Sequence, residues 1–167
     1  MIIDFNSASI PFSTLSVVKK SALLPHGGPA LRFLEEDMLF NYTTGILIAK
    51  KIVLYGFDFF GHFPKKPIYP SHCIIEGLGL AAGVLGKILN PFADGGTFQR
   101  NIKLKNSSVV LAGDTLFFLI TKKKMREAED GKIAIFSGCV YNQRKELVAD
   151  GDITGVDYIE VAPIIKV

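Results

Sequence analysis

Residues 71–89, SHCIIEGLGLAAGVLGKIL, form the one long apolar helix candidate in the chain, and they restrict its fold more than any other segment. Large apolar side chains fall on every side of this predicted helix, at Ile74, Ile75, Leu78, Leu80, Val84, Leu85 and Ile88. Because they leave no polar face, we expect the helix to be covered all round. The helix also contains Gly77, Gly79, Gly83 and Gly86. Each glycine costs about 1 kcal/mol of helix propensity relative to alanine, which favours a position where another backbone segment comes very close.

Several strand-like segments flank this helix in the sequence. A short capped helix is predicted within residues 13–26, ending at Pro25, and a turn is predicted at residues 41–45. A charged hairpin turn containing Asp130 and Gly131 is also predicted. The expected strands are 30–40, 45–54, 96–105, 114–124, 132–142 and 146–159. One long helix wrapped by a curved antiparallel β-sheet would satisfy these patterns, so we predict an α+β fold of the hotdog type.

Length and composition limit the functional classes. A chain of 167 residues with 49% apolar and 21% charged residues is typical of one globular domain, expected here over residues 1–167. A net charge of +3 without a basic and aromatic platform argues against nucleic acid. The apolar run from Cys73 to Gly86 is too short for a membrane span, and the first residues do not resemble a signal peptide. Two cysteines cannot form a disulfide framework, so we expect a cytoplasmic protein.

Glu76 is the one ionisable side chain between Cys73 and Gly86. Burying a carboxylate without a partner is costly, so such groups are usually paired or neutralised. One interpretation is a structural carboxylate that caps the helix or bonds to a neighbour. The other is a carboxylic acid that an apolar site keeps neutral and that donates a proton.

The segment before the helix, GHFPKKPIYP, places His62 among three prolines, Pro64, Pro67 and Pro70. A single histidine in a loop is more often structural than catalytic. The prolines nevertheless restrict the backbone around it, and a restricted backbone is what positioning a catalytic base requires.

Together these residues, GHFPKKPIYPSHCIIEG, resemble the active-site segment of the bacterial 3-hydroxyacyl-acyl-carrier-protein dehydratases, the FabA/FabZ group of hotdog enzymes. That family has a Gly-His-Phe-Pro motif, two further prolines, and an acidic residue fourteen positions after the histidine, an interval kept by His62 and Glu76. Three weaker similarities follow the family order: LLPHGGPA, VVLAGDTLFF and NQRKELVADGDITG. The resemblance covers roughly residues 15–158.

The resemblance implies an active site shared between two protomers that pair edge to edge, as a homodimer or a trimer of dimers. His62 would take the proton from the carbon next to the thioester carbonyl, and Glu76 of the partner subunit would protonate the departing 3-hydroxyl. The product would be a 2,3-enoyl thioester, and no cofactor is implied. The backbone N–H groups of Ser71, His72 and Cys73, in the first helical turn, would face the thioester oxygen. The residues expected to position the loop are Gly61, Phe63, Pro64, Pro67 and Pro70.

Other roles for residues of this segment are open. Lys65 and Lys66 would suit an acidic acyl carrier protein or the phosphate of its pantetheine arm, although exposed lysines are usually just solvated. His72 and Glu76, at i and i+4, could begin a metal site with Cys73 or His62, but no further ligand set is evident, so we predict no metal. Cys73 could act as a nucleophile near the helix N-terminus, although a core thiol is the commoner role.

Two positions depart from the family pattern. Leu80 replaces a glutamine that is common one helical turn after the acid, and Ser71 replaces a glycine after the third proline. Two alternatives to a dehydratase stay open. One is a hotdog thioesterase in which Glu76 activates water, although the pairing of His62 with Glu76 argues against it. The other is a non-catalytic acyl-binding or assembly subunit, which the loss of the glutamine at Leu80 keeps open.

Overall fold

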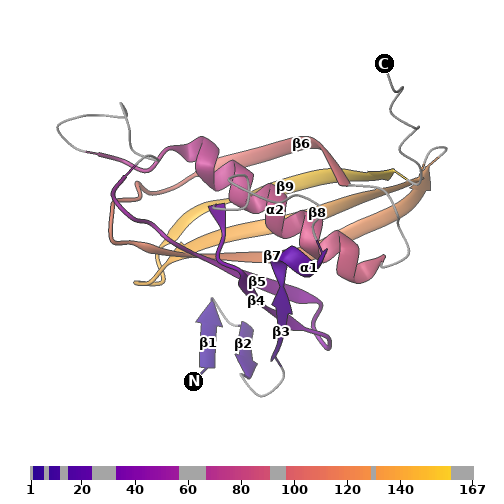
Figure 1. Cartoon of the computed structure of the whole chain (residues 1–167), viewed down its shortest axis with the longest axis horizontal. Helices are drawn as coiled ribbons and strands as arrows, with labels where there is room; N and C mark the ends of the chain where they lie inside the picture. The colour runs from indigo at the N-terminus through magenta and orange to yellow at the C-terminus, as the bar shows by residue number, and fades with distance from the viewer. Residues whose placement is uncertain are drawn as a thin grey trace.

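A seven-stranded antiparallel sheet curves around one long helix in the computed structural model of the protein (Figure 1). The structure describes residues 2–5, 8–11, 15–23, 33–56, 67–90, 97–128 and 131–158. Its elements are β1 (Ile2–Phe5), β2 (Ala8–Pro11), β3 (Leu15–Lys19), α1 (Lys20–Leu23), β4 (Asp37–Asn41), β5 (Ile46–Ile52), α2 (Ser71–Leu89), β6 (Thr97–Asn106), β7 (Thr115–Ala128), β8 (Gly131–Asn142) and β9 (Leu147–Tyr158). The large sheet has the order β3-β4-β5-β7-β8-β9-β6, and β1 pairs with β2 separately. The predicted hotdog fold is confirmed.

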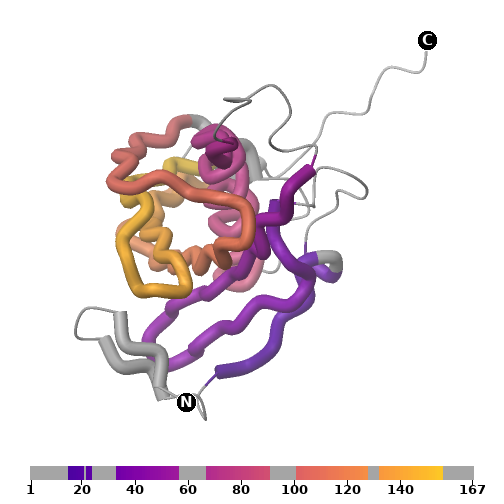
Figure 2. Tube along the Cα trace, turned by 90° about the vertical axis from the view of Figure 1, so that its left-hand side faces the viewer, coloured from indigo at the N-terminus to yellow at the C-terminus, as the bar shows by residue number. Residues whose placement is uncertain are grey.

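Helix α2 has the limits expected from the sequence, Ser71 to Leu89. It begins after Pro70, whose backbone is extended, and the N–H of Asn90 donates to the carbonyl of Gly86 at 2.9 Å where it ends. Seen nearly along its axis, α2 lies between strands β6 and β9 on one side and β3 and β4 on the other (Figure 2). Helix α2 is long and apolar enough to cross a membrane. However, 56% of its apolar 18-residue stretch is buried inside the protein, which is typical of a core helix.

Two glycines allow the helix and the sheet to approach closely. A Cβ on Gly77 would lie 2.8 Å from the ring of Phe118, and one on Gly138 of β8 would lie 2.7 Å from Cδ2 of Leu78. The close approach predicted for the helix glycines is therefore found at Gly77, although the neighbour there is an aromatic ring and not a backbone segment. The core around this contact includes Phe118, Phe136, Leu78, Leu85 and Ile153.

The expectation that α2 is covered all round is wrong for the single chain. His72 and Glu76 are exposed, and Ile75 and Leu80 are only partly buried. Ala81 to Gly86 are all buried, so this part of α2 is covered all round, and the side left open lies in the first three turns of the helix. We call the surface formed by His72, Ile75, Glu76, Gly79 and Leu80 the open face of α2.

Two local predictions near the N-terminus are also wrong. Leu15–Lys19, expected to begin a helix, forms β3 and pairs with β4 from Leu15↔Asn41 to Lys19↔Asp37. Its β-branched Val17 and Val18 favour a strand. The chain turns into the four-residue helix α1 at Lys20, whose buried Nζ donates to the carbonyl of Leu34 at 2.6 Å.

The strand expected over residues 30–40 is shorter than predicted, because β4 begins at Asp37 and the described residues before it, 33–36, are not extended. The turn predicted at residues 41–45 is confirmed. The side chain of Asn41 accepts the N–H groups of Thr43 and Thr44 there, each at 2.9 Å. The predicted turn between β7 and β8 falls partly outside the described residues, although Ala128 and Gly131 pair on either side of it.

Candidate active site

Glu76 lies in the second turn of α2, at the centre of the open face. One helical turn before it is the exposed His72, and one turn after it is the partly buried Leu80. The sequence predicted a buried glutamate, but a single chain does not bury it. The reason is that the large sheet contacts the opposite side of α2, where Ile74 and Leu78 are buried.

The candidate base lies outside the described residues. His62 belongs to residues 57–66, which the structure leaves undescribed, and its role therefore stays a prediction. The same holds for Gly61, Phe63, Pro64, Lys65 and Lys66. The segments on both sides of residues 57–66 are described, and each makes backbone hydrogen bonds to residues 110–114.

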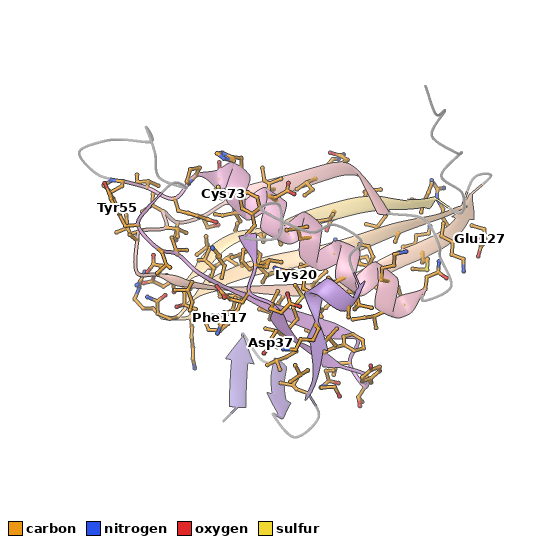
Figure 3. The ribbon with its side chains drawn as sticks, viewed as in Figure 1. Lys20, Asp37, Tyr55, Cys73, Phe117 and Glu127 are labelled. Atoms are coloured by element: carbon orange, nitrogen blue, oxygen red, sulfur yellow. The ribbon has the colours of Figure 1, made fainter. Side chains whose placement is uncertain are left out.

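The segment before the loop continues β5 through Val53 to Gly56. The N–H of Val53 donates to the carbonyl of Asp114 at 2.9 Å, and the carbonyl of Val53 accepts the N–H of Gly113 at 2.8 Å. Val53 is fully buried, whereas Leu54 and Tyr55 are exposed. Cys73 lies in the first turn of α2, and Tyr55 lies at the same end of the molecule (Figure 3).

The segment after the loop runs from Pro67 to Pro70 and leads directly into α2. The N–H of Tyr69 donates to the carbonyl of Val110 at 2.8 Å, and Ile68 forms an antiparallel bridge with Leu111. Tyr69 and Val110 are both buried. Both ends of the loop that carries His62 are therefore hydrogen-bonded to one short segment, residues 110–114, beside the start of α2.

The first turn of α2 has fewer available donors than expected. The N–H of Cys73 donates to the carbonyl of Pro70 at 3.0 Å, so it is not free to bind a thioester oxygen, contrary to the prediction. Ser71 and His72 precede the first hydrogen bond within the helix, so their N–H groups are the remaining candidates. The Cys73 side chain is only 2% exposed and belongs to the core, which supports the structural interpretation of this thiol.

A polar network that the sequence reasoning missed holds residues 110–114 in place. The carboxylate of Asp114 is almost fully buried. Its Oδ2 accepts the N–H of Leu111 at 3.0 Å, and its Oδ1 accepts Nε2 of Gln143 at 3.0 Å and Nη1 of Arg144 at 2.9 Å. Burial raises the pKa of Asp114, but these donors outweigh it and hold the pKa below its usual value. We call Asp114, Gln143 and Arg144 the Asp114 network.

The tip of the β8–β9 hairpin carries Gln143 and Arg144, and hydrogen bonds within the tip hold its backbone in place. Oδ1 of Asn142 accepts the N–H groups of Arg144 and Glu146, and Nδ2 of Asn142 donates to Oε2 of Glu146 at 2.6 Å. Lys145 adopts a positive φ of 65° in this turn. The sequence does contain a signal for this network, because Asp114 directly precedes the apolar run TLFF and would need hydrogen-bond partners if it were buried. The sequence does not show which residues those partners are.

Within the parts of the chain that the structure describes, no group of three or more His, Cys, Asp or Glu side chains could hold a metal ion. His72 and Glu76 lie on the open face, whereas Cys73 points into the core, so these three do not converge. The combination with His62 falls outside the described residues.

Comparison with known sequences identifies the family. No protein-family model matches the chain. The 3-hydroxyacyl-acyl-carrier-protein dehydratase FabZ of Chlamydia muridarum is 36% identical over 138 residues, which cover 80% of this chain and 86% of that protein. The enzyme of the same name from Proteus mirabilis is 33% identical over 80% of this chain and 97% of its own length. This chain belongs to the FabZ family.

Solved structures agree with the hotdog fold at much lower sequence identity. AziG of S. sahachiroi matches with a TM-score of 0.60 and 12% identity, over 78% of this chain and 97% of that chain. A hypothetical thioesterase from Streptococcus pneumoniae, solved with coenzyme A, matches with a TM-score of 0.52 and 10% identity, over 68% and 78% of the two chains. These similarities establish the fold alone.

Proposed function

We propose that the protein removes water from a (3R)-hydroxyacyl thioester on acyl carrier protein and forms a trans-2-enoyl thioester. The observation that carries this proposal is the position of Glu76. It lies fourteen residues after His62, as in the motif of the FabZ family, and it stands on the helix face that the chain leaves open. The hydrogen bonds of Val53 and Tyr69 to residues 110–114 support a defined start and end for the segment that carries His62.

In the proposed reaction, His62 removes the proton from the carbon next to the thioester carbonyl. Negative charge then develops on the carbonyl oxygen, where the N–H groups of Ser71 and His72 and the positive end of the helix dipole stabilise it. Glu76 donates its proton to the 3-hydroxyl, the bond between C3 and that oxygen breaks, and the C2–C3 double bond forms as water leaves. A positioned acid or base of this kind contributes about 10² to 10⁴ in rate.

We propose that the acid comes from the partner subunit of a homodimer, with a trimer of dimers as the larger possibility. Among the described strands, β6 ends the sheet and pairs on one side only, with β9. An unpaired sheet edge is a ready template for a second chain. Such pairing would supply the surface that the open face of α2 lacks, and would place Glu76 in the apolar setting that the sequence predicts.

The substrate would arrive on acyl carrier protein in the cytoplasm, and no cofactor is required by this chemistry. Lys65 and Lys66, on the catalytic loop, carry the charge that an acidic carrier protein or a pantetheine phosphate would meet. The FabZ relatives are named for acyl-carrier-protein substrates, which supports the same class.

Mass spectrometry of a medium-chain 3-hydroxyacyl carrier protein tests the reaction directly. We expect wild-type protein to remove one water, and the Glu76→Gln and His62→Ala variants to leave the substrate unchanged. Release of a free acid would instead indicate a thioesterase. Bound but unaltered substrate, across several chain lengths and carriers, would indicate an acyl-binding subunit.

A complementation experiment tests the shared site. His62→Ala and Glu76→Gln chains are unfolded together and refolded, so that mixed dimers form with one intact pair of catalytic groups. We expect part of the activity to return in the mixture and none in either homodimer. If the mixture stays inactive while wild type refolded in the same way is active, each site is built from one chain.

A further inference from the structure

Residues 110–114 contact the chain on both sides of the loop that carries His62. Val53, before the loop, exchanges hydrogen bonds with Gly113 and Asp114 at 2.8 and 2.9 Å. Tyr69 lies after the loop and two residues before α2 begins at Ser71, and its N–H donates to the carbonyl of Val110 at 2.8 Å. We call residues 110–114 the anchor turn, because both loop ends depend on its conformation.

The anchor turn does not hold its conformation through backbone contacts alone. Within it, the N–H of Asp114 donates to the carbonyl of Leu111 at 3.1 Å, and the Asp114 carboxylate accepts the N–H of Leu111 at 3.0 Å. The second carboxylate oxygen is held by Arg144 at 2.9 Å and by Gln143 at 3.0 Å. Oε1 of Gln143 also accepts the N–H of Thr115 at 2.8 Å, so the hairpin tip contacts both the Asp114 side chain and the backbone of the next residue.

We propose that Asp114 and Arg144 are positioning residues for the reaction at His62 and Glu76. They act through the anchor turn and do not touch the substrate. This inference rests on the proposed function, since it assigns to the Asp114 network the task of fixing the chain on both sides of the His62 segment relative to the first turn of α2, whose N–H groups would face the thioester oxygen. The acid of the same site would come from the partner subunit. Small displacements between catalytic groups are costly, because a shift of about 1 Å can lower a rate about 100-fold.

The burial pattern separates this role from general stability. The Arg144 side chain is 51% exposed, so solvent screens part of its attraction to Asp114. The carboxylate that Arg144 holds is only 7% exposed and is part of the turn itself. Removing Arg144 would leave the buried carboxylate with Leu111 and Gln143 as its donors, so the turn should loosen locally while strands away from it keep their structure.

The chain offers a matched control in the ion pair between Lys123 and Asp152. Lys123 is also 51% exposed, and its Nζ donates to Oδ1 of Asp152 at 2.6 Å, between β7 and β9. Both of these hydrogen bonds of Lys123 go to Asp152, which lies outside the anchor turn. Lys123→Ala removes a cation of the same exposure from a carboxylate that is 43% exposed, against 7% for Asp114, and should change neither the loop ends nor the activity.

The test combines amide hydrogen exchange with kinetics on the whole protein. In Arg144→Ala, exchange at residues 53–55 and 68–69 should become roughly tenfold faster, while β8 and β9 away from the hairpin tip keep their protection. With a 3-hydroxyacyl carrier protein as substrate, kcat should fall about 10- to 100-fold and KM should stay within about twofold. Arg144→Lys, which retains a cation beside Asp114, should restore part of the amide protection and part of kcat. Lys123→Ala should match wild type in both quantities.

The outcomes distinguish this inference from the proposed function. If wild type is an active dehydratase but exchange at the loop ends is unchanged in Arg144→Ala, the inference fails and the function stands. Faster exchange with an unaltered kcat also overturns it, because the network would then be structural only. If wild type forms no enoyl product while exchange responds as expected, the proposed function fails and the catalytic part of the inference fails with it.

Discussion

The two faces of α2 have similar apolar sequences and opposite surroundings. On the face toward the sheet, Leu78 and Leu85 are fully buried. On the open face, Ile75 and Leu80 are only partly buried, and Glu76 is exposed between them. The first face completes its packing within the chain, whereas the second carries the candidate acid and needs another surface to cover it. The comparison suggests that apolar residues left uncovered beside an acid mark a site and not a packing defect.

The largest expected effect is on the open face. Glu76→Gln keeps the shape of the side chain but cannot donate the acidic proton, so we expect kcat to fall about 10²- to 10⁴-fold. The Tm should stay within about 2 °C of wild type, because the side chain is exposed in the single chain. Steady-state kinetics and thermal unfolding measure both quantities. Glu127→Gln, at a carboxylate that is 78% exposed on β7, is the control and should retain full activity.

On the sheet-facing side the expected effect is on stability. Leu78→Ala removes a fully buried side chain and should lower the free energy of unfolding by about 2–5 kcal/mol. Urea denaturation monitored by circular dichroism gives this value. A loss below about 1 kcal/mol would show that the two faces are less different than their burial indicates.

The contact between Leu78 and β8 gives a sharper test of the same face. In Gly138→Ala the new methyl group would lie 2.7 Å from Leu78 and 3.0 Å from Ile153, and the crowded core should lose about 1–3 kcal/mol of stability. Gly56→Ala is the matched control, since nothing lies within 4 Å of a Cβ built there. Equal unfolding free energies for the two variants would mean that the sheet moves away from the helix without cost.

The face toward the sheet was predictable from the sequence, and the open face was not. Pro70 and the residues after Leu89 define the limits of α2, and the apolar run between them requires a sheet around it, so the fold followed from local signals. A sequence pattern says that a side chain is apolar but not which surface covers it. For this reason the burial of Glu76 within one chain was predicted wrongly.

The other errors have equally local causes. Residues 15–19 were expected to be helical because the segment from residue 13 begins like a capped helix and stops at Pro25, but pairing with β4 outweighs these weak local signals. The occupied N–H of Cys73 depends on a tight bond to Pro70 that no sequence pattern shows. The partners of Asp114 lie about thirty residues away, at a hairpin tip that approaches it only in the folded sheet.

The smallest expected effect concerns Leu80, which stands where the FabZ family commonly has a glutamine. A glutamine at this position, four residues after Glu76, could hydrogen-bond to the carboxyl group and orient it, and side-chain pairs at this spacing contribute about 0.2–0.5 kcal/mol. If that bond forms only with the acid in its productive orientation, Leu80→Gln should raise kcat by about 1.5- to 2.5-fold, measured under saturating substrate. Leu80→Ala, which removes the leucine without adding an amide, is the control and should not raise kcat. A fall in kcat with glutamine would instead mean that the leucine itself contributes apolar surface to the site. The surroundings of Glu76 would then be more apolar in this protein than in relatives with a glutamine at this position.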